Sequence, residues 1–147
     1  MMGKCLPIAF AAVFLTGCSM FTPYNGGVVM GEAVYLGYSR VADRQDVVFR
    51  QNVADLWDEV NKLESISDLV NSMDRLLLSF DNVLASDRLS PADRAVLVSL
   101  RQSVVSRVEA VLASRIQSNQ DAVDFLSGLR DGVNNMIAIE QAANETK

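Results

Sequence analysis

Histidine is absent from the 147 residues of this chain, which also contain only two cysteines and three prolines. Histidine is the commonest general base and the commonest metal ligand in proteins, so its absence argues against the usual hydrolytic and metal-dependent chemistries. The sequence also lacks a GxSxG nucleophile elbow, a Walker loop and a dinucleotide-binding fingerprint. We therefore expect no enzymatic activity, no bound metal and no soluble cofactor.

Positive charge is scarce: there are 13 lysines and arginines against 18 aspartates and glutamates, which gives a formal net charge of −5. Binding to nucleic-acid phosphates requires a basic patch, and electrostatic docking on anionic lipid requires clustered Lys or Arg. The basic residues of this chain are scattered arginines. We therefore expect no nucleic-acid binding and no docking on lipid that is driven by charge.

The first 17 residues have the layout of a bacterial export signal. Lys4 supplies a short positive region, and Leu6–Leu15 is an apolar run of the length found in signal peptides. The run is too short to cross a bilayer, which needs roughly 20 apolar residues. It ends in an aliphatic residue, two small residues and a cysteine, Leu15-Thr16-Gly17-Cys18.

This tetrapeptide resembles the lipobox of bacterial lipoproteins, with Thr16 at a place where Ala or Ser is more usual. The resemblance implies that a signal peptide, residues 1–17, is cleaved before Cys18. It also implies that diacylglycerol is attached to the Cys18 thiol and an acyl chain to the new amine. Two or three acyl chains anchor a protein stably, whereas one anchors it only marginally. Cys5 would leave with the signal, so the mature chain would hold no free thiol and no disulfide.

Ser19 follows the cysteine that would carry the lipid. In Gram-negative lipoproteins an aspartate at this place is associated with retention in the inner membrane, so Ser19 implies transfer to the outer membrane. We therefore expect a protein attached through Cys18 to the periplasmic face of the outer membrane. Two alternatives are a plain secretory signal with a chance cysteine and an uncleaved anchor helix, which Pro7 and the short apolar run disfavour.

Residues 18–32 predict a flexible tether. They contain Pro23, an asparagine and three glycines, a density of turn formers that is typical of a connection. From Cys18 to Glu32 such a tether reaches at most roughly 50 Å. Gly27 and Gly31 have the GxxxG spacing of close helix contacts, which a single instance outside a membrane span indicates only weakly.

The stretch Val28–Tyr38 carries one charge and shows no amphipathic period. A segment this apolar is usually covered, and three interpretations compete. It begins a helix that is buried in the domain, it lies in the lipid headgroup zone, where tyrosines are favoured, or it docks on a partner protein.

Residues 33–143 have a helical composition, since after Arg40 proline occurs only at Pro91 and glycine only at Gly128 and Gly132. Four stretches repeat apolar side chains at the spacing of amphipathic helices. Short connections between such helices favour antiparallel neighbours. The sequence therefore predicts an all-α domain, an up-down bundle of about four helices, with a frayed C-terminus at residues 144–147.

The first two stretches extend over about Ala33–Glu64 and Ile66–Leu84, with Ser65 or Ser67 as the N-cap of the second. Alternatively, the two form one long kinked helix. Acid-before-base pairs at i,i+4 are predicted at Asp46–Arg50 and Asp58–Lys62. The apolar stripe of the first stretch consists of Phe49, Val53, Leu56, Val60 and Leu63, and that of the second consists of Ile66, Leu69, Val70, Met73, Leu76, Leu77, Phe80, Val83 and Leu84.

The third stretch has the clearest beginning, because Ser90 suits an N-cap, Pro91 the first helical position and Asp93 the positive end of the helix dipole. Ser114–Gln120 either holds a turn, with Asn119 as a cap, or continues the helix. The third stripe consists of Leu97, Leu100, Val104, Val105, Val108, Val111 and Leu112, and the fourth consists of Ala122, Phe125, Leu126, Leu129, Val133, Met136 and Ile137.

Gly128 and Gly132 lie on one face of the fourth predicted helix, where each costs about 1 kcal/mol relative to alanine. They indicate either a weak or bent helix or a close helix crossing.

Carboxylates and one tryptophan are the remaining candidates for a binding site. The acidic groups are Asp55, Asp58 and Glu59, and Asp121 with Asp124. A pair of carboxylates on a helix is able to bind a divalent ion, but a solvated helix face is the commoner arrangement by far. We expect Trp57 in the core rather than as a platform for a ligand.

These observations favour an interaction or scaffold protein that is held on the outer membrane and binds another envelope component through helix contacts. Secretin pilotins and phage-encoded lipoproteins of lysis or superinfection exclusion are precedents for such a role. Two other classes remain: a ligand-binding or enzymatic domain with its site inside the bundle, and a structural lipoprotein that self-associates. The expected partners are membrane lipid, through Cys18, and an envelope protein or a second copy of the chain.

Overall fold

The computed structural model describes residues 22–113 and 118–146. These residues form five α-helices and one 3₁₀ turn, namely α2 (Pro23–Ala42), α3 (Val47–Asn61), η1 (Lys62–Ser65), α4 (Leu69–Leu84), α5 (Pro91–Ala113) and α6 (Ser118–Glu145). The described part of the chain contains no strand. The all-α prediction is confirmed, with five helices in place of about four.

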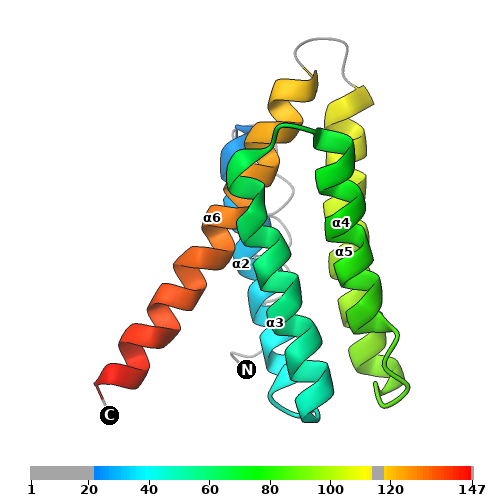
Figure 1. The fold of residues 1–147 in the computed structure, drawn as a ribbon, viewed down its shortest axis with the longest axis vertical. Helices are drawn as coiled ribbons and strands as arrows, with labels where there is room; N and C mark the ends of the chain where they lie inside the picture. The colour runs from blue at the N-terminus through cyan, green and yellow to red at the C-terminus, as the bar shows by residue number, and fades with distance from the viewer. Residues whose placement is uncertain (1–21, 114–117, 147) are drawn as a thin grey trace, which may run out of the picture.

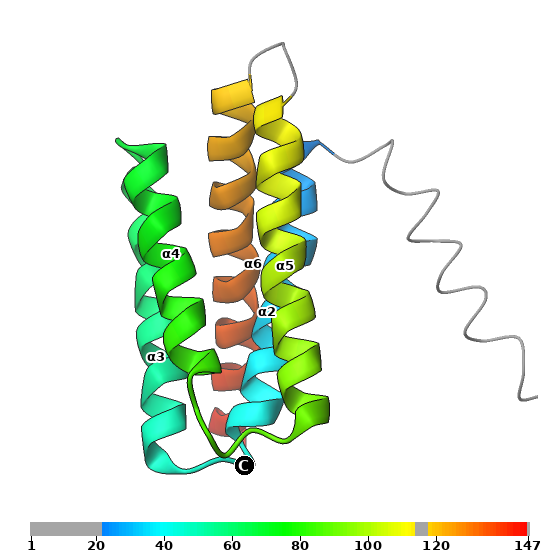
Figure 2. The ribbon, with the colours of Figure 1, turned by 90° about the vertical axis from the view of Figure 1, so that its right-hand side faces the viewer.

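Successive helices run in opposite directions along one long axis (Figure 1). α3 and α4 form one layer, and α2, α5 and α6 form a second layer (Figures 1 and 2). The predicted up-down arrangement is therefore confirmed. Because directions alternate along the chain, α2 and α6 run parallel to each other.

The first helix corrects the prediction of a flexible tether over residues 18–32. α2 begins at Pro23, and the Thr22 hydroxyl caps it by accepting a hydrogen bond from the backbone N–H of Asn25 at 3.3 Å. Proline suits this position because it has no N–H to leave unsatisfied. Residues 23–32 are therefore helical, whereas residues 18–21 lie outside the described part.

The apolar stretch Val28–Tyr38 lies within α2, with one side facing the protein interior and with Val29, Ala33 and Leu36 exposed on the other side. Val34, Tyr35 and Tyr38 are at most 8% exposed to solvent. The interpretation as a helix buried in the domain is therefore correct for the inner side of this stretch. Contact with lipid or with a partner stays a prediction for its exposed side.

The predicted single stretch Ala33–Glu64 is two helices joined by residues 43–46. Asp46 is the N-cap of α3 and accepts a hydrogen bond from the backbone N–H of Phe49 at 3.0 Å. Its carboxylate also lies 2.8 Å from Nη1 of Arg88. A capping carboxylate is held at the start of the helix, so the predicted i,i+4 pair of Asp46 with Arg50 is not among the ion pairs of the described residues.

The connection to α4 also differs from the prediction. Asp68 is the N-cap and accepts a hydrogen bond from the backbone N–H of Asn71 at 3.1 Å, in place of Ser65 or Ser67. α3 and α4 pack as antiparallel neighbours, so one long kinked helix is excluded.

Lys62 belongs to η1 and forms its ion pair with Glu59 rather than with the predicted partner, Asp58.

The predicted start of α5 is confirmed. The Ser90 hydroxyl accepts a hydrogen bond from the backbone N–H of Asp93 at 3.1 Å, and Pro91 is the first helical residue.

The ends of α6 differ from the predictions. Asn119 lies inside α6, which begins at Ser118, so it is not a cap. The helix continues to Glu145, so the predicted fraying of residues 144–147 is wrong for the first two of them. The predicted turn or helix at Ser114–Gln120 falls partly outside the described residues.

Most of the core comes from the predicted apolar stripes, to which α2 adds five buried residues between Val34 and Ala42. Val70 and Leu112 of the stripes are 68% and 40% exposed, and Leu77 and Val105 are half-buried outside the core cluster. The largest fully buried side chains are Tyr38, Phe49, Phe80, Phe125, Leu56, Leu76, Leu97, Leu126 and Leu129. They come from all five helices, so each helix contributes to one core.

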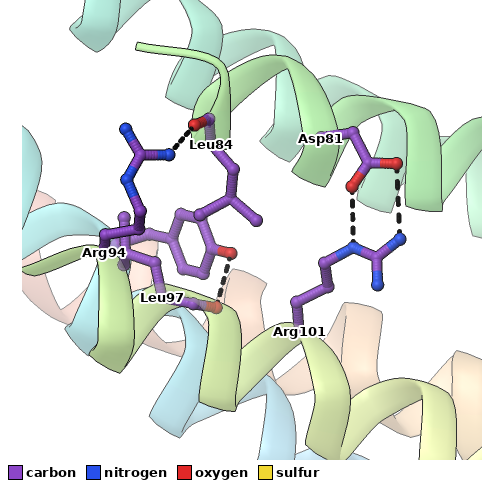
Figure 3. Close-up of polar contacts among 6 residues, drawn as sticks. Asp81, Leu84, Arg94, Leu97 and Arg101 are labelled. Atoms are coloured by element: carbon purple, nitrogen blue, oxygen red, sulfur yellow. Dashed lines mark hydrogen bonds and ion pairs between the residues drawn. The ribbon is translucent and has the colours of Figure 1, made fainter. Parts of the chain in front are cut away.

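Arg94 of α5 closes the C-terminal end of α4 (Figure 3). Its guanidinium donates to the backbone carbonyl of Leu84 and, at 2.7 Å, to that of Ser86. The last carbonyls of a helix have no partner within the helix and carry partial negative charge. Arg94 therefore satisfies and neutralises this helix end.

Two further polar contacts tie α5 to its neighbours (Figure 3). Nε of Arg101 lies 2.8 Å from Oδ1 of Asp81 on α4. The hydroxyl of Tyr38 on α2 donates to the backbone carbonyl of Leu97 at 3.0 Å. Burial raises the pKa of Tyr38, so this buried hydroxyl stays protonated at neutral pH.

Candidate functional site

The structure determines where the domain begins relative to the predicted lipid attachment. The predicted residues are Leu15, Thr16, Gly17, Cys18 and Ser19, which all lie outside the described part of the chain. Their roles therefore stay predictions. Thr22, the N-cap of α2, comes four residues after Cys18, and four residues of extended chain span at most about 14 Å. This link is much shorter than the predicted tether.

The helix that begins there is packed against α6 through four glycines, two in each helix, and this is the most extensive helix contact in the described residues. A Cβ atom on Gly27 would lie 2.0 Å from the carbonyl oxygen of Phe125. A Cβ atom on Gly31 would lie 2.1 Å from the carbonyl oxygen of Leu129. No side chain fits in either space, so the two backbones are in direct contact.

The glycines of α6 make the reciprocal contacts. A Cβ atom on Gly128 would lie 2.0 Å from the carbonyl oxygen of Tyr24, and one on Gly132 would lie 2.1 Å from that of Val28. The predicted possibility of a close helix crossing at these two residues is confirmed. Small residues four apart allow helix backbones to approach in this way.

Sequence reasoning did not connect the two glycine pairs. The available signal was their identical spacing in two helices that an up-down order makes parallel. The GxxxG pair of α2 lies in the segment predicted as a tether. Its glycines were therefore interpreted without reference to the matching pair in α6.

Polar side chains line both ends of the α2–α6 contact. Near its start the Tyr24 hydroxyl donates to Oδ2 of Asp131 at 2.6 Å, and Nη2 of Arg130 lies 2.6 Å from the other oxygen. This hydrogen bond raises the pKa of Tyr24. Burial of Asp131 opposes its ionisation, but the hydrogen bonds from Tyr24 and Arg130 outweigh it and lower the Asp131 pKa.

At the other end of the contact, the hydroxyl of Tyr35 donates to the carboxylate of Glu140. Burial, together with this hydrogen bond, raises the pKa of Tyr35 to about 12. The contact therefore joins a neutral phenol to a carboxylate across the two helices.

Trp57 is half-buried beside this region and packs against the core, as predicted. Its ring centroid is 5.3 Å from that of Tyr35 and 6.2 Å from that of Tyr38, with an edge-on arrangement at Tyr38. Tyr38 continues the group to Phe80, at 5.4 Å. Offset and edge-on geometries of this kind stabilise aromatic clusters, so the group explains the tryptophan as a packing residue.

The predicted acidic groups do not converge in the structure. Asp55 accepts a hydrogen bond from Gln51 at 2.9 Å, and Asp124 accepts one from Gln120 at 2.8 Å, in each case within one helix. Glu59 pairs with Lys62 of η1. In the described ranges no three His, Cys, Asp or Glu side chains are placed to share a metal ion.

Two open surface pockets are present. One, of about 420 Å³, lies between residues 63–67 and two residues of α6, Val123 and Ser127. The other, of about 370 Å³, lies between the start of α3 and the end of α4, beside the Asp46–Arg88 pair. The first lining holds Glu64 with three serines, and the second holds Asp46 and Asp87 with Ser86. In the described residues no serine hydroxyl of either lining is hydrogen-bonded to one of these carboxylates, a contact that a serine nucleophile and its base would need.

None of the described helices is both long enough and apolar enough to cross a membrane.

Comparison with protein-family models, curated proteins and solved structures gives no significant match. The features that bear on function are therefore the lipobox resemblance, the position of α2 and the surface of the bundle.

Proposed function

We propose that the protein is an outer-membrane lipoprotein whose helical bundle is an interaction or scaffold module for another component of the cell envelope. The observation that carries the proposal is that α2 begins only a few residues after Cys18 in the sequence. Three residues separate the predicted lipid anchor from Thr22, and four steps of extended chain span at most about 14 Å. An anchored bundle would therefore meet its partner at the membrane surface.

The α2–α6 contact supports this proposal because it connects the anchor to the whole domain. The helix that follows Cys18 is not a loose extension but is held against α6 by backbone contact. A force or a partner that acts on the bundle would therefore be transmitted to the lipid anchor through α2. A scaffold or recruiting module needs such a connection, whereas a freely diffusing ligand-binding domain does not.

The use of polar side chains in the described residues supports a non-enzymatic role. Arg94, Asp46 and Asp68 complete helix ends, and Arg101 pairs with Asp81 between helices. The described core is apolar apart from Ser72 and the hydroxyl of Tyr38, which donates to the carbonyl of Leu97. The arginines, the aspartates and Tyr38 have structural partners, and they are not gathered around one cavity.

In-cell cross-linking tests the proposal. A photoreactive residue is placed in turn at Val47 and Val48, the most exposed large apolar side chains of α3 at 69% and 68%. A variant with Cys18→Ala in the same background is the matched control. We expect an envelope protein to be captured when Cys18 is intact and to be lost with Cys18→Ala.

Two outcomes would contradict the proposed role. Capture of the chain by itself alone would favour the self-associating structural class. Capture of the same partner with equal yield from the Cys18→Ala variant would show that anchoring is irrelevant to the interaction.

A further inference from the structure

The outer side of α2 carries one charged side chain over its first 14 residues, the partly exposed Glu32. Asn25, Val29, Ala33 and Leu36 follow one another at spacings of four, four and three, which places them on one side of the helix. All four are exposed, and Val29 and Leu36 are each 42% exposed. The glycines Gly27 and Gly31 lie on the side that α6 covers.

α5 continues this surface next to α2. The two helices are close at Gly37, where a Cβ atom would lie 2.3 Å from Cδ1 of Leu100, and at Gly26, whose Cβ would be 3.8 Å from Nη2 of Arg107. Leu100 and Arg107 make these contacts. On the solvent side of α5, the residues one helical turn from them are uncharged. They are Val96, which is 51% exposed, Ser103 and Ala110.

We define the α2–α5 face as Val29, Ala33, Leu36, Val96, Ser103 and Ala110. Two arginines and the partly exposed Glu32 border this face. Arg40 is exposed in the last turn of α2, and Arg107 is partly exposed beside Gly26. Apolar side chains with arginine at the edge suit a lipid surface, where the aliphatic part of arginine stays in apolar surroundings and its guanidinium reaches the phosphates.

The α3–α4 layer carries more exposed acidic side chains than α2 and α5, on which Glu32 is partly exposed and Glu109 is exposed. Figure 2 shows α3 and α4 on one side of the molecule and α2 on the other. The exposed acidic residues of the α3–α4 layer are Asp55, Asp58, Glu64, Asp68, Asp74 and Asp81. Anionic lipid repels such a layer, so the charge distribution favours an orientation with α3 and α4 away from the membrane.

The position of the anchor agrees with this orientation. Cys18 is at most about 14 Å of extended chain from the start of α2, so a membrane that holds Cys18 is close to the N-terminal end of this helix. We propose that the α2–α5 face lies on that membrane, with α2 along its surface and the face in contact with phospholipid. This inference rests on the proposed lipid attachment.

Fluorescence quenching in vesicles tests the orientation. The full-length lipidated protein is reconstituted in vesicles of phosphatidylethanolamine and phosphatidylglycerol. Lipid blocks Cys18, so a single introduced cysteine is the only free thiol and takes an environment-sensitive fluorophore. The test position is Leu36→Cys on α2, and the matched control is Leu78→Cys on α4, where Leu78 is 61% exposed. Val29→Cys and Val48→Cys form a second pair, since both native side chains are exposed.

We expect nitroxide-labelled phospholipid to quench the probe at residue 36 several-fold more strongly than the probe at residue 78. Cobalt ions in the aqueous phase should show the reverse order. Circular dichroism of each labelled protein verifies that the bundle is folded.

Three results would overturn the inference. Equal quenching by cobalt at both positions, in protein that floats with the vesicles, would contradict the orientation and leave lipid attachment intact. Protection from cobalt without quenching by labelled lipid would show that a second copy covers the face. Protein that does not float, with an unmodified Cys18, would overturn both the inference and the proposed function.

Discussion

Gly31 of α2 and Leu129 of α6 are in backbone contact, since a methyl group on Gly31 would lie 2.1 Å from the Leu129 carbonyl oxygen. Glycine costs about 1 kcal/mol relative to alanine inside a helix, so helix formation alone does not explain its presence here. The contact explains the glycine, because the absence of a side chain lets the backbones of two parallel helices touch. This packing joins the helix next to the predicted anchor to the last helix of the bundle.

Gly27→Ala should destabilise the bundle. Its new methyl group would lie 2.0 Å from the Phe125 carbonyl oxygen, which is backbone and cannot move aside without separating α2 from α6. Overpacking of this kind typically costs about 1–3 kcal/mol. Urea unfolding followed by circular dichroism measures the change in the free energy of unfolding.

Gly26→Ala is the matched control, one residue away. The nearest atom to its methyl group would be Nη2 of Arg107, at 3.8 Å, so the methyl group fits. We expect up to about 1 kcal/mol of stabilisation, because alanine favours the helix. If Gly26→Ala and Gly27→Ala lowered stability equally, the crossing would not be the reason for the glycines.

Arg94→Met should weaken the end of α4. Methionine keeps most of the apolar stem but cannot donate to the carbonyls of Leu84 and Ser86. Hydrogen bonds from charged groups contribute about 1.5–3 kcal/mol, and we expect a loss in free energy of unfolding toward the lower end of that range. Amide hydrogen exchange in the last turn of α4 should accelerate.

Arg75→Met serves as the control for Arg94→Met. Arg75 is 56% exposed, and its Nε lies 3.7 Å from Glu59. Exposed pairs of this kind contribute about 0–1 kcal/mol, so the change should be small. Equal losses from the two variants would contradict the role of Arg94 as a helix cap.

Stability should fall above pH 10 because of the tyrosines. Burial and the hydrogen bond to Glu140 raise the pKa of Tyr35 to about 12 in the folded chain, against about 10 in an unfolded one. The folded state thus holds this proton more tightly, so the stabilisation is complete below pH 10 and is lost as the pH rises through about 12.

Absorbance of tyrosinate at alkaline pH, with and without urea, measures this shift. Tyr35→Phe should remove the part of the folded-state titration near pH 12, while burial keeps the pKa of Tyr38 raised. A folded-state titration near pH 12 that Tyr35→Phe leaves unchanged would contradict the assignment.

The helical class and most of the core were predictable from local patterns. The stripe Phe49 to Leu63 is fully buried because its spacing matches one face of a helix. The start of α5 was predictable because Ser90 and Pro91 act locally, through the first turn of a helix.

Features that depend on contacts distant in the sequence were not predictable in the same way. Gly27 and Gly31 were interpreted as turn formers, because their partners in α6 are about 100 residues away and a local pattern does not include them. The break at residues 43–46 was missed because neither proline nor glycine marks it. Aspartate caps at Asp46 and Asp68 mark the new helices instead.

The chemical state of Cys18 in separated membranes is the decisive measurement for lipid attachment. Inner and outer membranes of cells that produce the full chain are separated, and the N-terminal peptide of the protein is analysed by mass spectrometry. The account predicts an outer-membrane protein whose first residue is Cys18, with diacylglycerol on the thiol and an acyl chain on the amine. A chain that retains residues 1–17, or that carries an unmodified Cys18, would contradict it.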